Sequence, residues 1–195
     1  MPGGPDQVTQ RADARRNRAR ILEVAVDGFA REGLGISIQE IARRAGVSTG
    51  TVSRHFPTKD DLFAAIVLDR VQRLVTTAQT LAASQPPGPA FYRFIEVMAL
   101  EGAENRAIAD ALAGAGFDVQ AAAGGAGDDL MSGWSALLAR AQAAGQVRSD
   151  ITMEDVKALV VGCCVRRGDP ESTKAATRRL LSVVTAGLQP TAQPE

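Results

Sequence analysis

Residues Ser37–Phe63 read SIQEIARRAGVSTGTVSRHFPTKDDLF and predict two short helices joined by a tight turn. Ser37 followed three residues later by Glu40 predicts a capping box at the start of the first helix, and Gly46 predicts its end. Ser48 is a favourable N-cap for the second helix. Two such helices joined by a glycine-containing turn are typical of a helix-turn-helix unit.

The start of the second helix carries only small residues, Ser48–Thr51. In a helix-turn-helix unit this end enters the major groove of DNA, where bulky side chains would hold the backbone away. Free backbone N–H groups and the helix dipole there favour phosphate oxygens. Thr49, Thr51, Ser53 and Arg54 are placed to reach base edges or the DNA backbone, and Arg is the commonest reader of guanine.

The charge distribution is uneven, although the chain has no net charge. Residues 1–59 hold ten Lys or Arg and six Asp or Glu, whereas residues 60–195 hold twelve and sixteen. A basic head on an acidic body favours an anionic polymer as the partner of the head, with a plain solvated charged face as the alternative. Arg15, Arg16, Arg18 and Arg20 suit either a basic arm or a first helix near the DNA backbone.

Helical periodicity extends over nearly all of the chain, and no stretch alternates as a strand does. We therefore predict an all-α fold. After a disordered arm at about 1–12, the expected helices span about 13–32, 38–45, 48–56, 59–83, 89–104, 106–114, 128–144, 153–167 and 170–188. The segment SQPPGP at 84–89 is the clearest boundary. It divides a DNA-binding domain (1–58) and a connecting helix (59–83) from a ligand-binding and dimerisation domain (84–195).

Several classes of function lack support. No run of about 18 apolar residues is present, and the first ten residues lack the apolar core of a signal peptide, so we expect a cytoplasmic protein with no membrane partner. Cys163 and Cys164 with one distant histidine cannot form a four-ligand zinc site, and no cofactor is expected. No Ser/His/Asp set or phosphate loop is visible, so an enzyme is a weak alternative, as is a helical scaffold that binds only proteins.

The stretch SIQEIARRAGVSTGTVSRHFPTKDDLF, preceded by ILEVAVDGFAREG, resembles the DNA-binding domain of the tetracycline-repressor (TetR) family. The resemblance covers about residues 15–65, and one position departs from it: Ser53 stands where the family usually has a phosphate-contacting Tyr, a role that Arg54 could take over. The resemblance implies that His55 and Lys59 contact the DNA backbone and that Ser37 lies at the groove. The candidate DNA-binding residues are Ser37, Arg43, Arg44, Ser48, Thr49, Gly50, Thr51, Ser53, Arg54, His55 and Lys59.

Each candidate has a plainer alternative. Gly50 either lets DNA approach or permits close packing within the protein, and His55 either binds DNA or is structural. Arg43 and Arg44 either contact DNA or are solvated. Lys59 either contacts phosphate or is simply a surface residue at the start of a helix.

The resemblance also implies a homodimer that pairs its last two helices with those of its partner, and a small-molecule effector site in the carboxyl-terminal half. Candidate ligand-binding residues are Phe94, Met98, Phe117, Met131, Trp134 and Leu138, with a place in the hydrophobic core as the alternative for each. Trp134 is the strongest candidate, because a buried indole N–H needs an acceptor. We therefore expect a ligand-responsive regulator of palindromic operator DNA, a repressor rather than an activator, which the effector releases.

Overall fold

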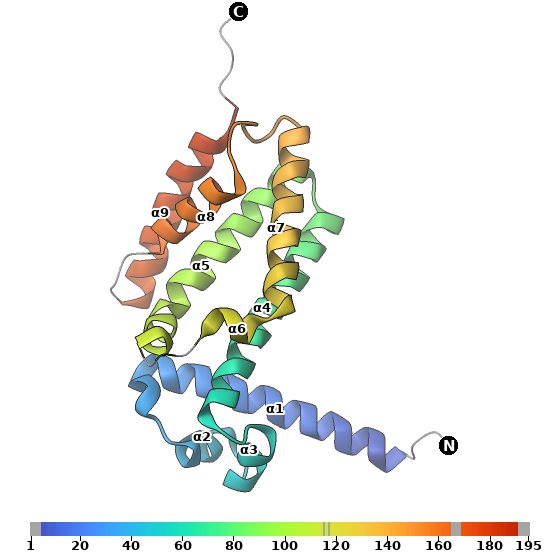
Figure 1. The fold of residues 1–195 in the computed structure, drawn as a ribbon, viewed down its shortest axis with the longest axis vertical. Helices are drawn as coiled ribbons and strands as arrows, with labels where there is room; N and C mark the ends of the chain where they lie inside the picture. Colours follow the sequence, from blue (N-terminus) through green and yellow to red (C-terminus); the bar gives the residue numbers. More distant parts are fainter. Residues whose placement is uncertain (1–4, 115, 117, 165–168, 191–195) are drawn as a thin grey trace, which may run out of the picture. The chain divides into compact units, whose positions relative to one another are not determined.

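The computed structural model describes residues 5–114, 116, 118–164 and 169–190, and these form α-helices with one 3₁₀ turn and no strand. The all-α prediction is confirmed (Figure 1). The elements are α1 (Pro5–Glu32), η1 (Gly33–Gly35), α2 (Ile38–Ala45), α3 (Thr49–His55), α4 (Lys59–Ser84), α5 (Pro87–Gly114), α6 (Val119–Ala123), α7 (Gly125–Ala143), α8 (Met153–Cys163) and α9 (Pro170–Leu188).

The chain divides into two compact units. The first consists of residues up to Asp69 together with 107–122, and the second of residues 70–106 and 123 onwards. Both α4 and α5 contribute residues to each unit. Segment 107–122 thus groups with the amino-terminal unit, although the sequence suggested that everything after residue 84 forms one domain.

The first unit is built around a hydrophobic cluster from α1, α2, α3 and the start of α4. The cluster exists because each helix turns one apolar stripe inward at a spacing of three and four residues. Its buried members are Ile21, Leu22, Ala25, Phe29, Ile36, Ile41, Ala42, Ala45, Val52, Phe56, Leu62, Phe63, Ala65 and Ile66. The rings of Phe29 and Phe63 pack with their centroids 4.9 Å apart. This cluster fixes α3, so the exposed face of α3 is held on a rigid support.

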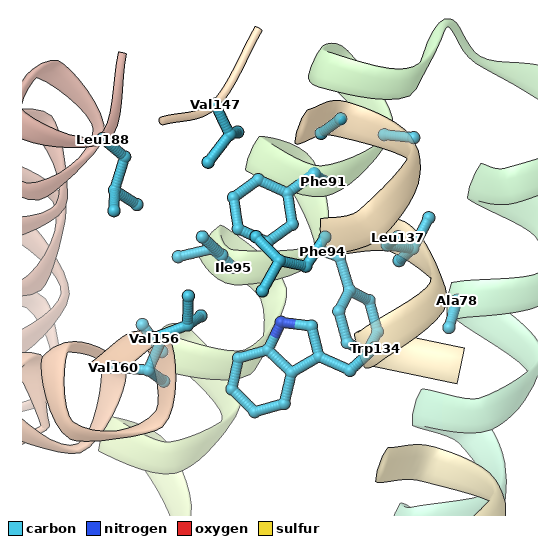
Figure 2. Packing of buried hydrophobic residues seen from close by; sticks show 14 of the residues in the cluster. Ala78, Phe91, Phe94, Ile95, Trp134, Leu137, Val147, Val156, Val160 and Leu188 are labelled. Carbon is cyan, nitrogen blue, oxygen red and sulfur yellow. The ribbon is translucent and has the colours of Figure 1, made fainter. Parts of the chain in front are cut away.

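The second unit has its own cluster, centred on α5, α7, α8 and α9 (Figure 2). Phe91, Phe94 and Ile95 of α5 are fully buried, and Trp134 of α7 lies edge-on to Phe94 with ring centroids 5.9 Å apart. Thr177 of α9 donates a hydrogen bond of 3.3 Å to the Cys163 carbonyl, which ties α9 to the end of α8.

Side-chain caps fix the starts of several helices. Thr152 and Asp155 form a reciprocal capping box at α8, and Asp169 caps α9 by accepting from the Ser172 N–H at 3.0 Å. Such caps satisfy N–H groups that have no partner inside the helix. At α4 the Thr58 N–H donates to the Asp61 carboxylate at 2.9 Å, so α4 begins one residue after Thr58, as expected.

Several elements differ from the sequence prediction. Helix α1 begins at Pro5, so residues 5–12 are helical where a disordered arm was expected. Helix α5 runs unbroken from Pro87 to Gly114, where two helices were expected. Gly102, inside α5, is explained by packing, because a Cβ there would lie 2.7 Å from the Cys164 sulfur of α8. Helix α6 and turn η1 were not predicted, since five- and three-residue segments carry too little periodicity to detect.

Cys163 and Cys164 are both buried free thiols. Burial raises the pKa of the Cys163 thiol. The Cys164 thiol donates to the Ala99 and Val160 carbonyls at 3.3 and 3.2 Å. Both side chains therefore act as small core residues.

Candidate nucleic-acid interface

The turn between α2 and α3 is set by Gly46, whose φ of 64° lies in the left-handed region. Its N–H donates to the carbonyls of Ala42 and Arg43, and the Val47 N–H donates to the Ala42 carbonyl at 3.0 Å. A side chain at residue 46 would strain this conformation, so glycine ends α2 and redirects the chain into α3. The Arg20 guanidinium of α1 reinforces the same turn by donating to the Ala45 carbonyl at 3.2 Å. This role of Arg20 was not predicted.

Helix α3 starts with Ser48, whose hydroxyl accepts from the Thr51 N–H at 3.1 Å. The hydroxyls of Ser48 and Thr51 also lie 2.8 Å apart and share a hydrogen bond. These two candidates therefore shape the helix start, and Thr51 is half-buried, whereas Ser48 is exposed. Next to them, Thr49 and Gly50 are exposed, so the amino-terminal tip of α3 is open to solvent.

Gly50 has no packing role inside the protein. A Cβ built there would have the Ser48 hydroxyl oxygen at 3.9 Å as its nearest neighbour within 4 Å, an ordinary contact. By contrast, a Cβ at Gly28 of α1 would lie 2.6 Å from Ile36. Glycine in a helix costs about 0.5–1 kcal/mol relative to alanine. Nothing within the described chain requires glycine at residue 50, and the missing side chain leaves the tip of α3 open to an outside partner.

The opposite side of α3 anchors the helix. Val52 and Phe56 are buried, whereas Ser53 and Arg54 are exposed. The ring of His55 is half-buried and tilted beside Phe56, with ring centroids 6.1 Å apart. Arg18 of α1 places its guanidinium 5.6 Å from the centre of the Phe56 ring, a contact that the sequence did not reveal. One face of α3 is thus buried, at Val52 and Phe56, and the other is exposed, as a reading helix needs.

Arg43 and Arg44 take part in a network with two glutamates. Glu40 accepts from the Arg43 Nε at 2.7 Å and from the Arg44 Nε at 2.6 Å, and Arg44 also pairs with Glu32 at 2.5 Å. These hydrogen bonds lower the pKa of Glu40 to about 2, and the bonds from Arg43 have a larger effect than the bond from Arg44.

This network corrects one expectation about α2. The Ser37 hydroxyl, which is exposed, accepts from the Glu40 N–H at 3.1 Å and so caps α2. The Glu40 side chain bonds the two arginines, so the expected reciprocal capping box is half formed. The carboxylate turns away from Ser37 because two guanidinium groups offer charge-assisted hydrogen bonds.

Lys59 is also engaged within the first unit. Its ammonium donates to the Leu34 carbonyl in η1 and lies 5.9 Å from the centre of the Phe29 ring. Lys59 therefore holds η1 against the start of α4 in this structure. A contact between Lys59 and a phosphate stays a prediction.

In the second unit the predicted ligand residues come from α5 and α7. Phe94, Trp134 and Leu138 are buried in the cluster, and Met98 and Met131 are half-buried against it. Phe117 lies outside the described residues. The Trp134 Nε1 atom is buried and has no hydrogen-bond acceptor among the described residues, and Figure 2 shows the indole among Val156, Val160, Phe94 and Ile95. A buried donor without an acceptor costs about 1–3 kcal/mol.

Glu101 on α5 is engaged within the second unit. It accepts from Arg70 at 2.6 Å and from the Asn105 amide at 3.1 Å, an ion pair in place of a free carboxylate. In the described part of the chain no group of three His, Cys, Asp or Glu could hold a metal ion. The helices of that part also include none with the length and apolar character that a membrane span needs.

A helix-turn-helix with an exposed small-residue tip, fixed by a buried cluster, defines a DNA-binding transcriptional regulator. Residues 21–66 match the family model described as bacterial regulatory proteins of the tetR family. Residues 86–190 match the model described as the C-terminal domain of SbtR-like transcriptional regulators. The chain belongs to the TetR family of transcriptional regulators.

Solved structures agree over nearly the whole chain. A TetR transcription regulatory protein from Mycobacterium vanbaalenii is 45% identical, with a TM-score of 0.77 over 93% of this chain and 99% of that one. A TetR transcriptional regulator from Streptomyces coelicolor is 35% identical, with a TM-score of 0.75 over 90% of this chain and 99% of that one.

Among curated proteins, an HTH-type transcriptional regulator of Staphylococcus aureus (strain USA300) is 47% identical over 53 residues. That match spans 27% of this chain and 29% of the Staphylococcus protein. The similarity between the two is therefore confined to less than a third of either chain.

Proposed function

We propose that the chain is a ligand-responsive transcriptional repressor, acting in the cytoplasm, that binds palindromic operator DNA as a homodimer and is released by a small-molecule effector. The single observation that carries DNA reading is the exposed tip of α3 at Gly50, where no side chain stands between the helix backbone and an approaching duplex. Thr49, Ser53 and Arg54 surround it and are exposed. Arg54 has no ion pair or hydrogen bond within the described residues, so its guanidinium is available for a base or a phosphate.

Exposed apolar side chains support the homodimer. In the described part of the chain, the large hydrophobic side chains left exposed are Leu159 and Val161 on α8 and Leu180 and Val183 on α9. Leu180 and Val183 lie three residues apart and so share one face of α9. Other apolar side chains of these two helices belong to the core of the chain itself: Val156, Val160, Cys163, Cys164, Leu181 and Leu188. A twofold pair would cover the exposed set and present two α3 helices to half-sites about 34–36 Å apart.

The effector proposal rests on Trp134. An effector with a carbonyl or hydroxyl oxygen would accept from its buried Nε1, which has no acceptor among the described residues. Binding there would shift the helices of the second unit, and α4, which contributes residues to both units, would carry the change to the DNA-binding unit. Coupling of this kind is typically about 1–3 kcal/mol per site.

Selection of bound sequences from random DNA, followed by gel shifts at two salt concentrations, tests DNA reading. We expect a palindrome, and we expect Arg54→Ala to weaken binding and relax preference at the position that Arg54 reads. A chain that selects no sequence would contradict the proposed function. A reporter gene behind the selected palindrome separates repression from activation.

The effector is tested with the fluorescence of Trp134, the single tryptophan of the chain. A compound library screened by the emission of this residue identifies ligands, and each ligand is then added to the operator complex. Release of DNA supports the mechanism. If every ligand that shifts the emission leaves operator affinity unchanged, the proposed release mechanism is wrong.

A further inference from the structure

An open groove of about 430 Å³ lies between α5 and α9 of the second unit. Its α5 side carries Tyr92, Arg93 and Glu96. The same two helices are joined by an ion pair between Lys174 and Glu104, 2.8 Å apart. Sites for small molecules typically have volumes of about 300–1,000 Å³, so the groove is large enough to hold one.

The groove lies on the side of α5 opposite the predicted effector residues. At about 100° per residue, the three lining residues of α5 centre about 170° away from Phe94 and Met98. Phe94 is fully buried and packs edge-on against Trp134. The groove is therefore a different site from the one proposed at Trp134.

On α9 the groove lies opposite the exposed apolar residues proposed for the homodimer. The lining residues of α9 are Arg178, Leu181, Ser182 and Thr185. They centre about 180° away from Leu180 and Val183 at about 100° per residue. Pairing of two chains through Leu180 and Val183 would therefore leave the groove open to solvent.

Arg178 supplies the uncompensated charge of the groove. Among the described residues that line it, Arg93 and Glu96 pair with each other. Arg178 is exposed and has no ion pair or hydrogen bond within the described part of the chain. Its planar guanidinium matches the paired oxygens of a carboxylate or a similar oxyanion.

The hydroxyl groups of the groove already donate their protons. Tyr92, Ser182 and Thr185 each donate to a backbone carbonyl at 2.8 Å. Arg178 therefore offers the donors that a ligand can use, whereas the Tyr92 ring and Leu181 offer apolar surface. A molecule that complements this lining has one anionic group and an apolar body.

We propose that the α5–α9 groove binds an amphipathic monoanion, with its anionic group on Arg178 and its apolar body against Tyr92 and Leu181. Aromatic carboxylates and sulfonates belong to this class. The site is additional to the effector site and to the DNA-binding surface. Because the ligand would contact both α5 and α9, its binding stabilises the folded second unit.

The test uses two fluorescent probes that differ in one group. Anilinonaphthalene sulfonate is an amphipathic monoanion whose emission rises when it binds protein, and phenylnaphthylamine has the same rings without the sulfonate. Arg178→Ala should raise the Kd of the sulfonate about five- to tenfold, between the effects of an exposed ion pair and of a charge-assisted hydrogen bond. It should leave the Kd of the neutral probe unchanged. Arg178→Lys keeps the charge and should lose less affinity than the alanine variant.

Arg179→Ala is the matched control, because Arg179 is also exposed on α9 but does not line the groove. It should bind both probes as the wild type does. Ser182→Leu narrows the groove without changing its charge, and it should also weaken sulfonate binding. Circular dichroism and sedimentation check that each variant keeps its helices and its assembly.

Equal sulfonate Kd values for Arg178→Ala and Arg179→Ala would overturn this inference, as would a wild type that does not bind the sulfonate. Equal weakening of both probes by Arg178→Ala would also overturn it, since Arg178 would then not act through its charge. These measurements contain no DNA, so each of these results leaves the proposed function standing.

Discussion

Replacing Gly50 with alanine should move stability and DNA affinity in opposite directions. The new Cβ has its nearest neighbour at 3.9 Å, so it fits without strain. Removing a helical glycine should raise the free energy of unfolding by about 0.5–1 kcal/mol. For a chain of this size the melting temperature should rise by about 1–4 °C. Differential scanning calorimetry measures this gain.

The same methyl group should weaken operator binding. It occupies the space through which the tip of α3 approaches the groove, and losing one base contact costs about 1–3 kcal/mol. With one such loss in each half-site, at least about 2 kcal/mol in total, the operator Kd should rise at least about 30-fold. Fluorescence anisotropy with a labelled palindrome measures the change.

Gly125→Ala is the matched control for Gly50→Ala. Gly125 is the first residue of α7 and is exposed, and a methyl group added to it would have no neighbour within 4 Å. This variant should gain stability in the same way and leave DNA affinity unchanged. If Gly50→Ala binds the operator as tightly as the wild type, the tip of α3 does not enter the groove closely and the reasoning from Gly50 is refuted.

Three further predictions concern other parts of the molecule. Because the pKa of Glu40 falls from its ordinary 4.5 to about 2 in the folded chain, its stabilising effect is present above pH 4.5 and is lost as the pH falls toward 2. The difference in urea midpoint between wild type and Glu40→Gln should shrink over this range, and a difference independent of pH would contradict the ion pairs. Val183→Asp, at a side chain 72% exposed in the single chain, should give a folded monomer in sedimentation experiments, and a persistent dimer would remove α9 from the interface. Phe91→Ala should cost about 3–5 kcal/mol in urea unfolding, since Phe91 is fully buried, and a cost below about 1 kcal/mol would contradict that burial.

The sequence predicts the helix-turn-helix well because its signals are local. Ser48, Gly46 and the alternation of Val52 with Ser53 act within one or two turns, so neighbouring residues are sufficient to place them. The predicted break in α5 is wrong because no Gly or Pro interrupts residues 103–107, and the helix continues through them. Local signals are therefore reliable where a cap or a breaker is present.

The partners of the cations could not be predicted from the sequence. Lys59 reaches the Leu34 carbonyl, and Arg44 pairs with Glu32 as well as with Glu40 four residues away. Contacts such as those of Lys59 with Leu34 and of Arg20 with Ala45 join residues 25 apart in the chain, so they depend on how the helices pack. The lack of an acceptor for the Trp134 N–H likewise could not be predicted, because it depends on which side chains from several helices surround the indole.

The buried residues of α3 are different from its exposed residues, and this separation affects how the regulator could change its DNA target. Val52 and Phe56 attach the helix to the core, whereas Thr49, Ser53 and Arg54 are exposed. Substitutions at exposed positions usually change stability by less than about 0.5 kcal/mol. The three residues proposed to read the operator can therefore be exchanged at little cost in stability, so we expect that recoding these positions on an unchanged scaffold would give a new DNA target.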